Sequence, residues 1–406
     1  MDSLITAAAR SLMEGDPLTA LKHVALREDP PAVALRGTAM AQLGDLNTAR
    51  QLLRRAARAF GPREATARAR CRVAEAEIAL VLRDIREPMH DLEDARATLG
   101  QHGDRANEAH AGYLQARRLL LIGQLDQAQA ILEALEPAAL RPASRAGAWL
   151  VAAGIAIRRI EAEPARAALG KAALAAEQTG IAMLVAEVER AARAFEAPAA
   201  RLLTRSEERL LGLDEVEALI ASDTLVVDAL RGLVRANGEV VPLSRRPVLF
   251  ALVRALAEAW PGDVSREILL ARAFRARQVD ETHRARLRVE IGRLRFELGP
   301  LANVLATESG FVLQPSGARP VAVLAPPQED EHANVLALLA DGEAWSSSAL
   351  ALALDVSSRT IQRALKELAS AGRADSFGRG RACRWTMRQV PGFPTSLLLP
   401  APLPTG

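Results

Sequence analysis

The stretch HRARLRVEIGRLRFELG, residues 283–299, decides how the C-terminal half of the chain is interpreted. Charged and apolar residues alternate over 284–291, as in a half-buried strand, but the alternation breaks after residue 291. Four apolar residues instead recur at spacings of 4, 3 and 4: Leu287, Ile291, Leu294 and Leu298. Such spacing places all four on one face of a helix. The Gly-Pro pair at 299–300 is typical of a helix end, so the sequence predicts a helix here.

The opposite face of this helix carries mostly small or apolar residues between two rows of arginine. Its middle is formed by Ala285, Val289, Gly292 and Phe296. The flanks are formed by Arg286 and Arg293 on one side and by Arg288 and Arg295 on the other. This shape suits the major groove of DNA, where small side chains meet base edges and guanidinium groups reach phosphates. A helix buried on two sides, with arginines extending outward to solvent, explains the pattern equally well.

Composition and charge describe a globular chain with local basic regions. The 406 residues predict two to four domains, half of the residues are apolar, and the formal net charge is +3. Residues 281–295 hold five arginines against two glutamates, and residues 359–388 hold seven arginines and one lysine against two acidic residues. Both basic clusters lie in the C-terminal half, which favours nucleic acid over a membrane as the partner.

The first half of the chain is rich in Ala, Leu, Arg and Glu and predicts helices throughout. Similar phrases recur in it: LGDLNTARQLLRRAAR (43–58), MHDLEDARATLG (89–100), IGQLDQAQAILEAL (122–135) and EAEPARAALGKAALAA (161–176). Their alanines at 49, 95, 128 and 165 are 46, 33 and 37 residues apart. The pattern resembles degenerate tetratricopeptide repeats, and an irregular helical bundle is the alternative.

From about residue 203 the sequence pattern changes and predicts short strands and helices. Asn237-Gly238 predicts a hairpin turn, residues 245–259 and 264–274 predict helices, and NVLATESGFVLQP predicts two strands around Ser309-Gly310. The Pro-rich stretch PSGARPVAVLAPPQEDE predicts a semi-extended linker. We therefore expect these boundaries: a repeat domain at 1–203, a second domain at 204–316, a linker at 317–331, a third domain at 332–390 and a Pro-rich tail at 391–406.

Several phrases of the second domain together resemble the OmpR/PhoB-type winged-helix effector domain over about 90 residues. They are a strand-rich segment at the start of the domain and the motifs LSRRP, VSREILL, RVEIGRLRFELG and TESGFVL that follow it. The resemblance implies that the 283–299 helix and the following wing contact DNA. The implied contact positions are Arg286, Val289, Glu290, Gly292, Arg293 and Arg295. Gly292 and Glu308 depart from the basic or longer polar residues usual there, which implies weaker phosphate contact.

A second helix-turn-helix pattern occupies residues 345–388. Ser357 caps its second helix, Ile361, Leu365 and Leu368 form the core stripe, and GRGRACRW follows as a basic hairpin. The segment resembles a DeoR-like winged helix. Its candidate DNA contacts are Ser358, Arg359, Thr360, Gln362, Arg363, Lys366, Arg379 and Arg381. A protein-interaction module with a solvated basic face is the alternative.

Residue types for catalysis or metal binding are not grouped in this sequence. The chain lacks a phosphate-binding GxxxxGK[ST] loop, its six histidines have no metal-ligand spacing, and its two cysteines suggest a reducing compartment. We therefore expect a cytoplasmic protein that is not an enzyme and that has no cofactor, metal or membrane contact.

Taken together, the sequence predicts a mainly α protein with an N-terminal tetratricopeptide-like repeat domain followed by two winged-helix (α+β) domains. The expected function is sequence-specific transcriptional regulation in bacteria. The expected partners are double-stranded DNA, a second copy of the chain in a homodimer, and a protein or small-molecule effector on the repeat domain. Regulators that join an OmpR-type domain to such repeats, the antibiotic regulatory proteins, are similar in content but usually carry the DNA-binding domain first. A scaffold or adaptor whose winged helices dock proteins is the alternative function.

Overall fold

The computed structural model describes most of the chain. The described residues are 2–81, 89–121, 123–274, 281–327, 332, 335–336, 339, 345–354, 356–378, 380 and 383–387. The chain divides into two compact units. The first contains residues 1–156 and 164–192, and the second contains residues 157–163 and 193–389.

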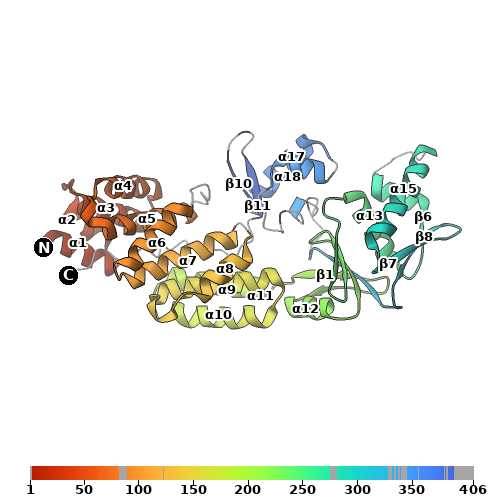
Figure 1. Ribbon diagram of the computed structural model, residues 1–406, viewed down its shortest axis with the longest axis horizontal. Helices are drawn as coiled ribbons and strands as arrows, with labels where there is room; N and C mark the ends of the chain where they lie inside the picture. The colour runs from red at the N-terminus through yellow and green to blue at the C-terminus, as the bar shows by residue number, and fades with distance from the viewer. Residues whose placement is uncertain are drawn as a thin grey trace. The chain divides into compact units, whose positions relative to one another are not determined.

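Helices make up the N-terminal half, as the sequence predicts (Figure 1). The α-helices are α1 (Ser3–Met13), α2 (Pro17–Val24), α3 (Pro30–Gln42), α4 (Leu46–Ala59), α5 (Ala65–Val81), α6 (Met89–Gln101), α7 (Arg105–Leu121), α8 (Leu125–Glu133), α9 (Pro142–Arg159), α10 (Ala162–Glu177) and α11 (Ala182–Glu196). Two short 3₁₀ turns, η1 (Pro62–Glu64) and η2 (Pro137–Ala139), lie between them. From α3 to α8 each helix packs against the next one along the chain.

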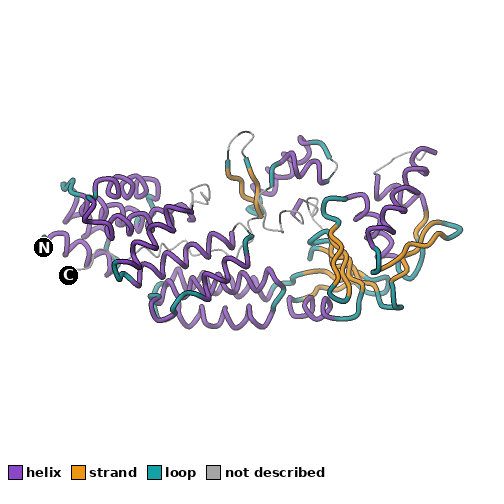
Figure 2. Tube along the Cα trace, in the orientation of Figure 1, coloured by secondary structure: helices purple, strands orange, loops and turns teal. Residues whose placement is uncertain are grey.

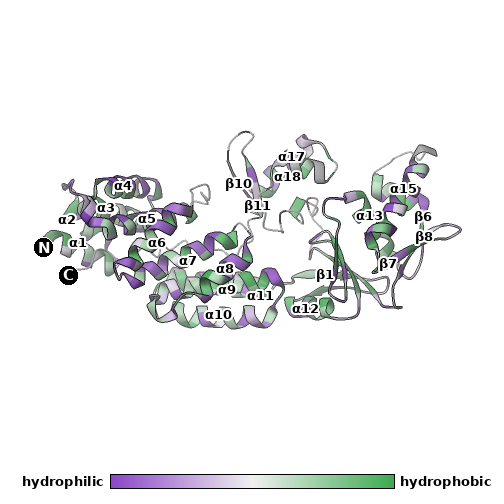
Figure 3. Cartoon of the chain, in the orientation of Figure 1, coloured by the Kyte–Doolittle hydropathy of each residue, from purple (hydrophilic) through white to green (hydrophobic). Residues whose placement is uncertain are grey.

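The recurring phrases mark places where these helices begin and where they pack. Asp45 caps α4 by accepting a hydrogen bond from the Thr48 amide at 3.1 Å, and Gly44 supplies the positive φ of the preceding turn. The four anchor alanines are all buried, with exposures of 0%, 4%, 0% and 0% at positions 49, 95, 128 and 165. The helices accordingly carry hydrophobic and hydrophilic segments side by side (Figure 3). The helical prediction is confirmed, whereas the tetratricopeptide-like repeat remains a prediction.

A six-stranded sheet opens the second unit, with its strands in the order β2-β1-β9-β3-β4-β5. Strands are drawn in orange in Figure 2. Its strands are β1 (Ala200–Leu203), β2 (Glu208–Leu211), β3 (Leu225–Asp228), β4 (Leu233–Ala236), β5 (Glu239–Pro242) and β9 (Val321–Ala325). The short helix α12 (Leu213–Ala221) follows β2. The β4–β5 hairpin turns at Asn237 and Gly238, both with positive φ, which confirms the predicted turn.

Two predicted boundaries are wrong because of this sheet. Residues 317–331 are not simply a linker, since β9 pairs antiparallel with β1 and parallel with β3 and all five of its residues are buried. The second domain also begins before residue 204, since β1 is one of the partners of β9. A parallel strand covered on both faces is a continuous apolar run, so VAVLA has no alternating pattern to reveal it.

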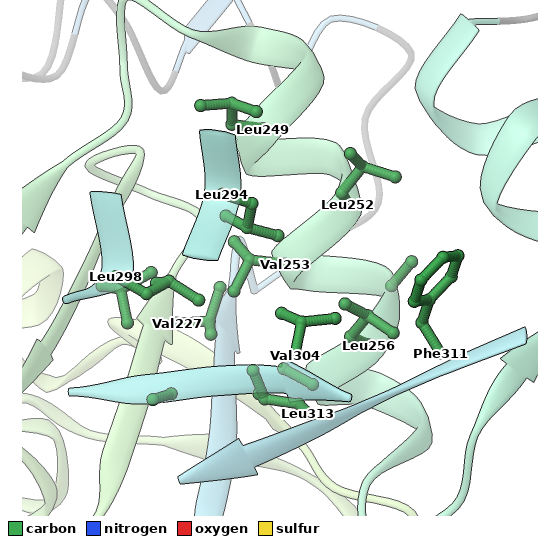
Figure 4. Close-up of a cluster of buried hydrophobic side chains, with 14 of the residues drawn as sticks. Val227, Leu249, Leu252, Val253, Leu256, Leu294, Leu298, Val304, Phe311 and Leu313 are labelled. Carbon is green, nitrogen blue, oxygen red and sulfur yellow. The ribbon is translucent and has the colours of Figure 1, made fainter. Parts of the chain in front are cut away.

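Three helices and a small sheet form the next layer of the second unit. These elements are α13 (Pro247–Ala259), α14 (Arg266–Phe274), α15 (Glu281–Leu298), β6 (Val264–Ser265), β7 (Ala302–Ala306) and β8 (Gly310–Pro315). The three strands pair in the order β6-β8-β7. Leu294 and Leu298 of α15 lie in one buried cluster with residues of α13, of the β7–β8 hairpin and of β3 (Figure 4). Each such leucine contributes about 1.5–3 kcal/mol by leaving water.

The last described part repeats a smaller helix-and-hairpin pattern. It contains α17 (Ser347–Ala353), α18 (Ser358–Ser370), β10 (Ala374–Phe377) and β11 (Arg384–Met387). Ser357 caps α18 by accepting from the Thr360 amide at 3.1 Å, and Ile361, Leu365 and Leu368 are buried in one cluster. The predicted helix pair and hairpin are therefore present.

Candidate functional site

Helix α15 has one buried face and one exposed face. Leu287, Ile291, Leu294 and Leu298 are each at most 2% exposed. On the other side Val289 is 53% exposed and Phe296 is 83% exposed, and both Ala285 and Gly292 are exposed as well. The alternative of a helix buried on two sides is therefore wrong, because its second face is open.

Most of the candidate arginines of α15 have partners within the protein. The Arg286 guanidinium lies 4.6 Å from the centroid of the Phe274 ring. Arg293 pairs with Glu290 one turn away, at 2.8 Å, and the Arg295 Nε donates a hydrogen bond to the Val304 carbonyl oxygen at 2.6 Å. The flanking charges are thus held near the helix, and only part of each guanidinium is available to a partner.

Arg293 and Glu290 differ in how far they are exposed. The Arg293 side chain is 64% exposed, whereas the Glu290 side chain is only 13% exposed. Only the arginine side of this ion pair is open to solvent. Replacing Glu290 by an outside anion would leave a largely buried carboxylate without its partner, so the exchange carries a desolvation cost. Arg288, which lies on a flank but was not among the predicted contact residues, is exposed and forms no ion pair with another described residue.

The turn of the β7–β8 hairpin is fixed by two residues near the start of α14. Asp263 accepts hydrogen bonds from the hydroxyl groups of Ser309 and Thr307, the latter at 2.6 Å. These bonds, that of Ser309 foremost, lower the pKa of the Asp263 carboxyl below its ordinary value. Arg266 donates to the carbonyl oxygens of Glu308 at 2.8 Å and Thr307 at 3.0 Å.

Sequence reasoning missed Asp263 and Arg266. They lie more than forty positions before their partners in the TESG turn. Asp263 and Thr307 are 44 positions apart in the sequence, and Arg266 and Glu308 are 42 positions apart. No local pattern joins residues so far apart. The result is a hairpin turn that is hydrogen-bonded to residues at the start of α14, with the exposed Glu308 at its tip.

Helix α18 presents a hydrogen-bonding face. The predicted contact residues on it are all exposed: Ser358, Arg359, Thr360, Gln362, Arg363 and Lys366. The Thr360 hydroxyl lies 2.8 Å from that of Ser357, so it belongs to the helix cap. Arg363 lies 3.8 Å from Glu367, which itself contacts His332 at 2.5 Å. Arg379 and Arg381, predicted for the second hairpin, lie outside the described residues.

The described residues contain no group of three or more His, Cys, Asp or Glu side chains that could hold a metal ion. Among those residues, no helix is both long enough and apolar enough to cross a membrane.

Comparison with known proteins gave no match to a family model, to a curated protein or to a solved structure.

Proposed function

We propose that the chain is a bacterial transcriptional regulator that reads double-stranded DNA through two winged-helix units. The single observation that supports this most is the exposed face of α15. Its four middle residues are open to solvent, arginines flank them, and a hairpin with a fixed turn follows the helix. A helix with one free face beside a hairpin is the arrangement by which winged helices enter the major groove.

Helix α18 supports the same proposal with different chemistry. Its first turns expose Arg359, Gln362 and Arg363, which can donate to base edges and phosphates. The hairpin β10–β11 follows it as a second wing. In this proposal the helical half of the chain binds an effector or a second copy of the chain, and the protein acts in the cytoplasm as a homodimer. A homodimer predicts paired half-sites in the bound DNA.

Selection from a random duplex library with the full chain tests the proposal. We expect one sequence class to be enriched. If about six phosphates are neutralised, its log affinity falls with log salt with a slope near −5. The variant Arg63→Gln, which removes an exposed charge in η1 of the helical unit, serves as the matched control and leaves the affinity unchanged. Binding that depends on neither sequence nor salt would contradict the proposal.

A scaffold or adaptor remains the second candidate, favoured by the 83% exposure of Phe296. An exposed aromatic side chain is typical of protein-binding surfaces. Chromatin immunoprecipitation separates the two functions, because a regulator enriches defined genomic fragments. An adaptor enriches none and instead purifies in fixed stoichiometry with one protein.

A further inference from the structure

Gly292 lies at the centre of the exposed face of α15, where the fold gives no reason for a glycine. Nothing lies within 4 Å of the position that a Cβ would occupy there. The residue is within a regular helix, so it does not need the positive φ that glycine tolerates. Glycine in a helix interior is less stable than alanine. The missing side chain therefore leaves space for something outside the protein.

Two exposed apolar side chains stand on either side of that space. Val289 precedes Gly292 by three residues and Phe296 follows it by four, so each is about one helical turn away. At about 100° per residue the three positions fall within an arc of roughly 60°. With exposures of 53% and 83%, both side chains project into solvent. We call this feature, with Gly292 as its floor and Val289 and Phe296 as its walls, the α15 notch.

The notch offers apolar contact rather than hydrogen bonds. Its walls are hydrocarbon, and the backbone amides in the middle of a helix are already bonded within the helix. Of the guanidinium groups around Gly292, that of Arg293 pairs with Glu290 and that of Arg295 donates to the Val304 carbonyl oxygen, which leaves Arg288, one turn before Gly292, to reach a phosphate at the flank. Most features of base edges in the major groove are hydrogen-bond donors or acceptors, which would go unpaired here. The exception is the 5-methyl group of thymine.

We propose that the α15 notch receives the 5-methyl group of a thymine in the major groove. The inference rests on the proposed function and adds to it the base that this helix reads. Val289 and Phe296 enclose the methyl group, and Gly292 lets the helix backbone approach the base edge closely. The guanidinium groups on the flanks contact the phosphates on both sides.

The test uses the full chain and the duplex enriched by selection. Each thymine is replaced in turn by deoxyuridine, which removes the methyl group and keeps the base pairing. We expect a loss of about fourfold in affinity at one thymine per bound unit, the effect of one buried carbon. The Phe296→Ala variant should bind the thymine and deoxyuridine duplexes at that position equally well.

Gly292→Ala separates a binding role from a structural one. The added methyl group has room within the protein and favours the helix, so the melting temperature should rise by about 2 °C. It fills the notch, so affinity should fall roughly tenfold or more. A protein that is more stable but binds less tightly is the expected result. The deoxyuridine effect should disappear in the same variant.

The possible outcomes distinguish the inference from the proposed function. An enriched duplex that tolerates deoxyuridine at every position would overturn the α15 notch as a thymine reader and leave DNA binding intact. Full affinity of the Gly292→Ala variant would do the same. If no duplex were enriched, the proposed function and the inference would both be wrong.

Discussion

Helices α15 and α18 are both basic and both precede a hairpin, yet they present different exposed faces. On α15 the middle of the face is apolar, and Arg286, Arg293 and Arg295 each have a partner in the protein. On α18 the face consists of hydroxyl, amide and cationic groups, and the Arg363 contact with Glu367 is a loose 3.8 Å. The number of arginines in a stretch therefore does not measure the charge available to a partner.

The largest change in affinity is expected when two arginines are neutralised on each helix in turn. We expect Arg359→Gln with Arg363→Gln to lower affinity for the selected duplex about 100-fold, because each lost contact costs about 1–3 kcal/mol. The matched change, Arg286→Gln with Arg293→Gln, should cost about tenfold or less, since both groups are partly engaged within the protein. Fluorescence anisotropy at a fixed salt concentration measures both.

The control for this experiment removes two charges from the helical unit, by Arg10→Gln with Arg63→Gln, two exposed positions. It should leave affinity unchanged. Equal losses of affinity from the α15 and α18 double variants would contradict this prediction. They would show that a partner within the protein does not reduce the contribution of an arginine to DNA binding.

Glutamates on the two helices allow a second, smaller test. Glu290→Gln releases Arg293 from a 2.8 Å ion pair and removes a negative charge near the phosphates, so affinity should rise about threefold. Glu367→Gln changes both the 3.8 Å contact with Arg363 and the 2.5 Å contact with His332, and because the Arg363 contact is loose it should raise affinity less than Glu290→Gln does. The same anisotropy assay applies. Weaker binding of the Glu290→Gln variant would mean that Glu290 itself accepts a hydrogen bond, for example from a cytosine amino group.

Elements that depend on residues close together in the chain could be predicted from the sequence. The leucine spacing in α15, the Asn237-Gly238 turn and the Ser357 cap all depend on residues close together in the chain, and all three are present. The same spacing locates the second face of α15, but the sequence alone could not decide whether that face is open or buried.

Features that depend on distant residues were not predictable. β9 pairs with β1 and β3, which lie some hundred residues earlier, and its short apolar run within a Pro-rich stretch does not by itself indicate these partners. The partners of Arg286 and Arg295 belong to α14 and β7, so the two arginine rows looked free in the sequence. A helical periodicity places a side chain on a face, but only tertiary packing decides what that side chain touches.

Chemical labelling of the two cysteines tests the contact of the second hairpin, β10–β11, with DNA separately from that of α15. Cys71 is 4% exposed, and burial raises the pKa of its thiol to about 12, so it should not react with maleimide at pH 8. Cys383 is partly exposed next to β11 and should react. Bound duplex should slow its labelling by about two- to fivefold if the second hairpin lies against DNA, since the reagent needs access to the thiolate. Mass spectrometry locates the label, and a rate unchanged by DNA would leave α15 as the main reader.

The smallest effect concerns how the first hairpin is fixed. Because hydrogen bonds from Ser309 and Thr307 lower the pKa of Asp263, this group stabilises the folded hairpin above its ordinary pKa of 3.8 and loses that contribution as pH falls through the lower folded value. At neutral pH the stabilising contribution of the Asp263 carboxylate to the hairpin turn is therefore fully present. Carboxyl chemical shifts should show an Asp263 midpoint below 3.8.

The Asp263→Asn variant removes that charge at every pH. The Gly310 amide donates to the Thr307 hydroxyl oxygen at 2.9 Å, so its hydrogen exchange reports on the turn and should become faster. DNA affinity at pH 7 should change by less than about twofold, because Arg266 still donates to the Glu308 and Thr307 carbonyl oxygens and keeps the turn closed. A large loss of affinity from this change would mean that the conformation of the turn, rather than the apolar face of α15, limits binding by the first unit.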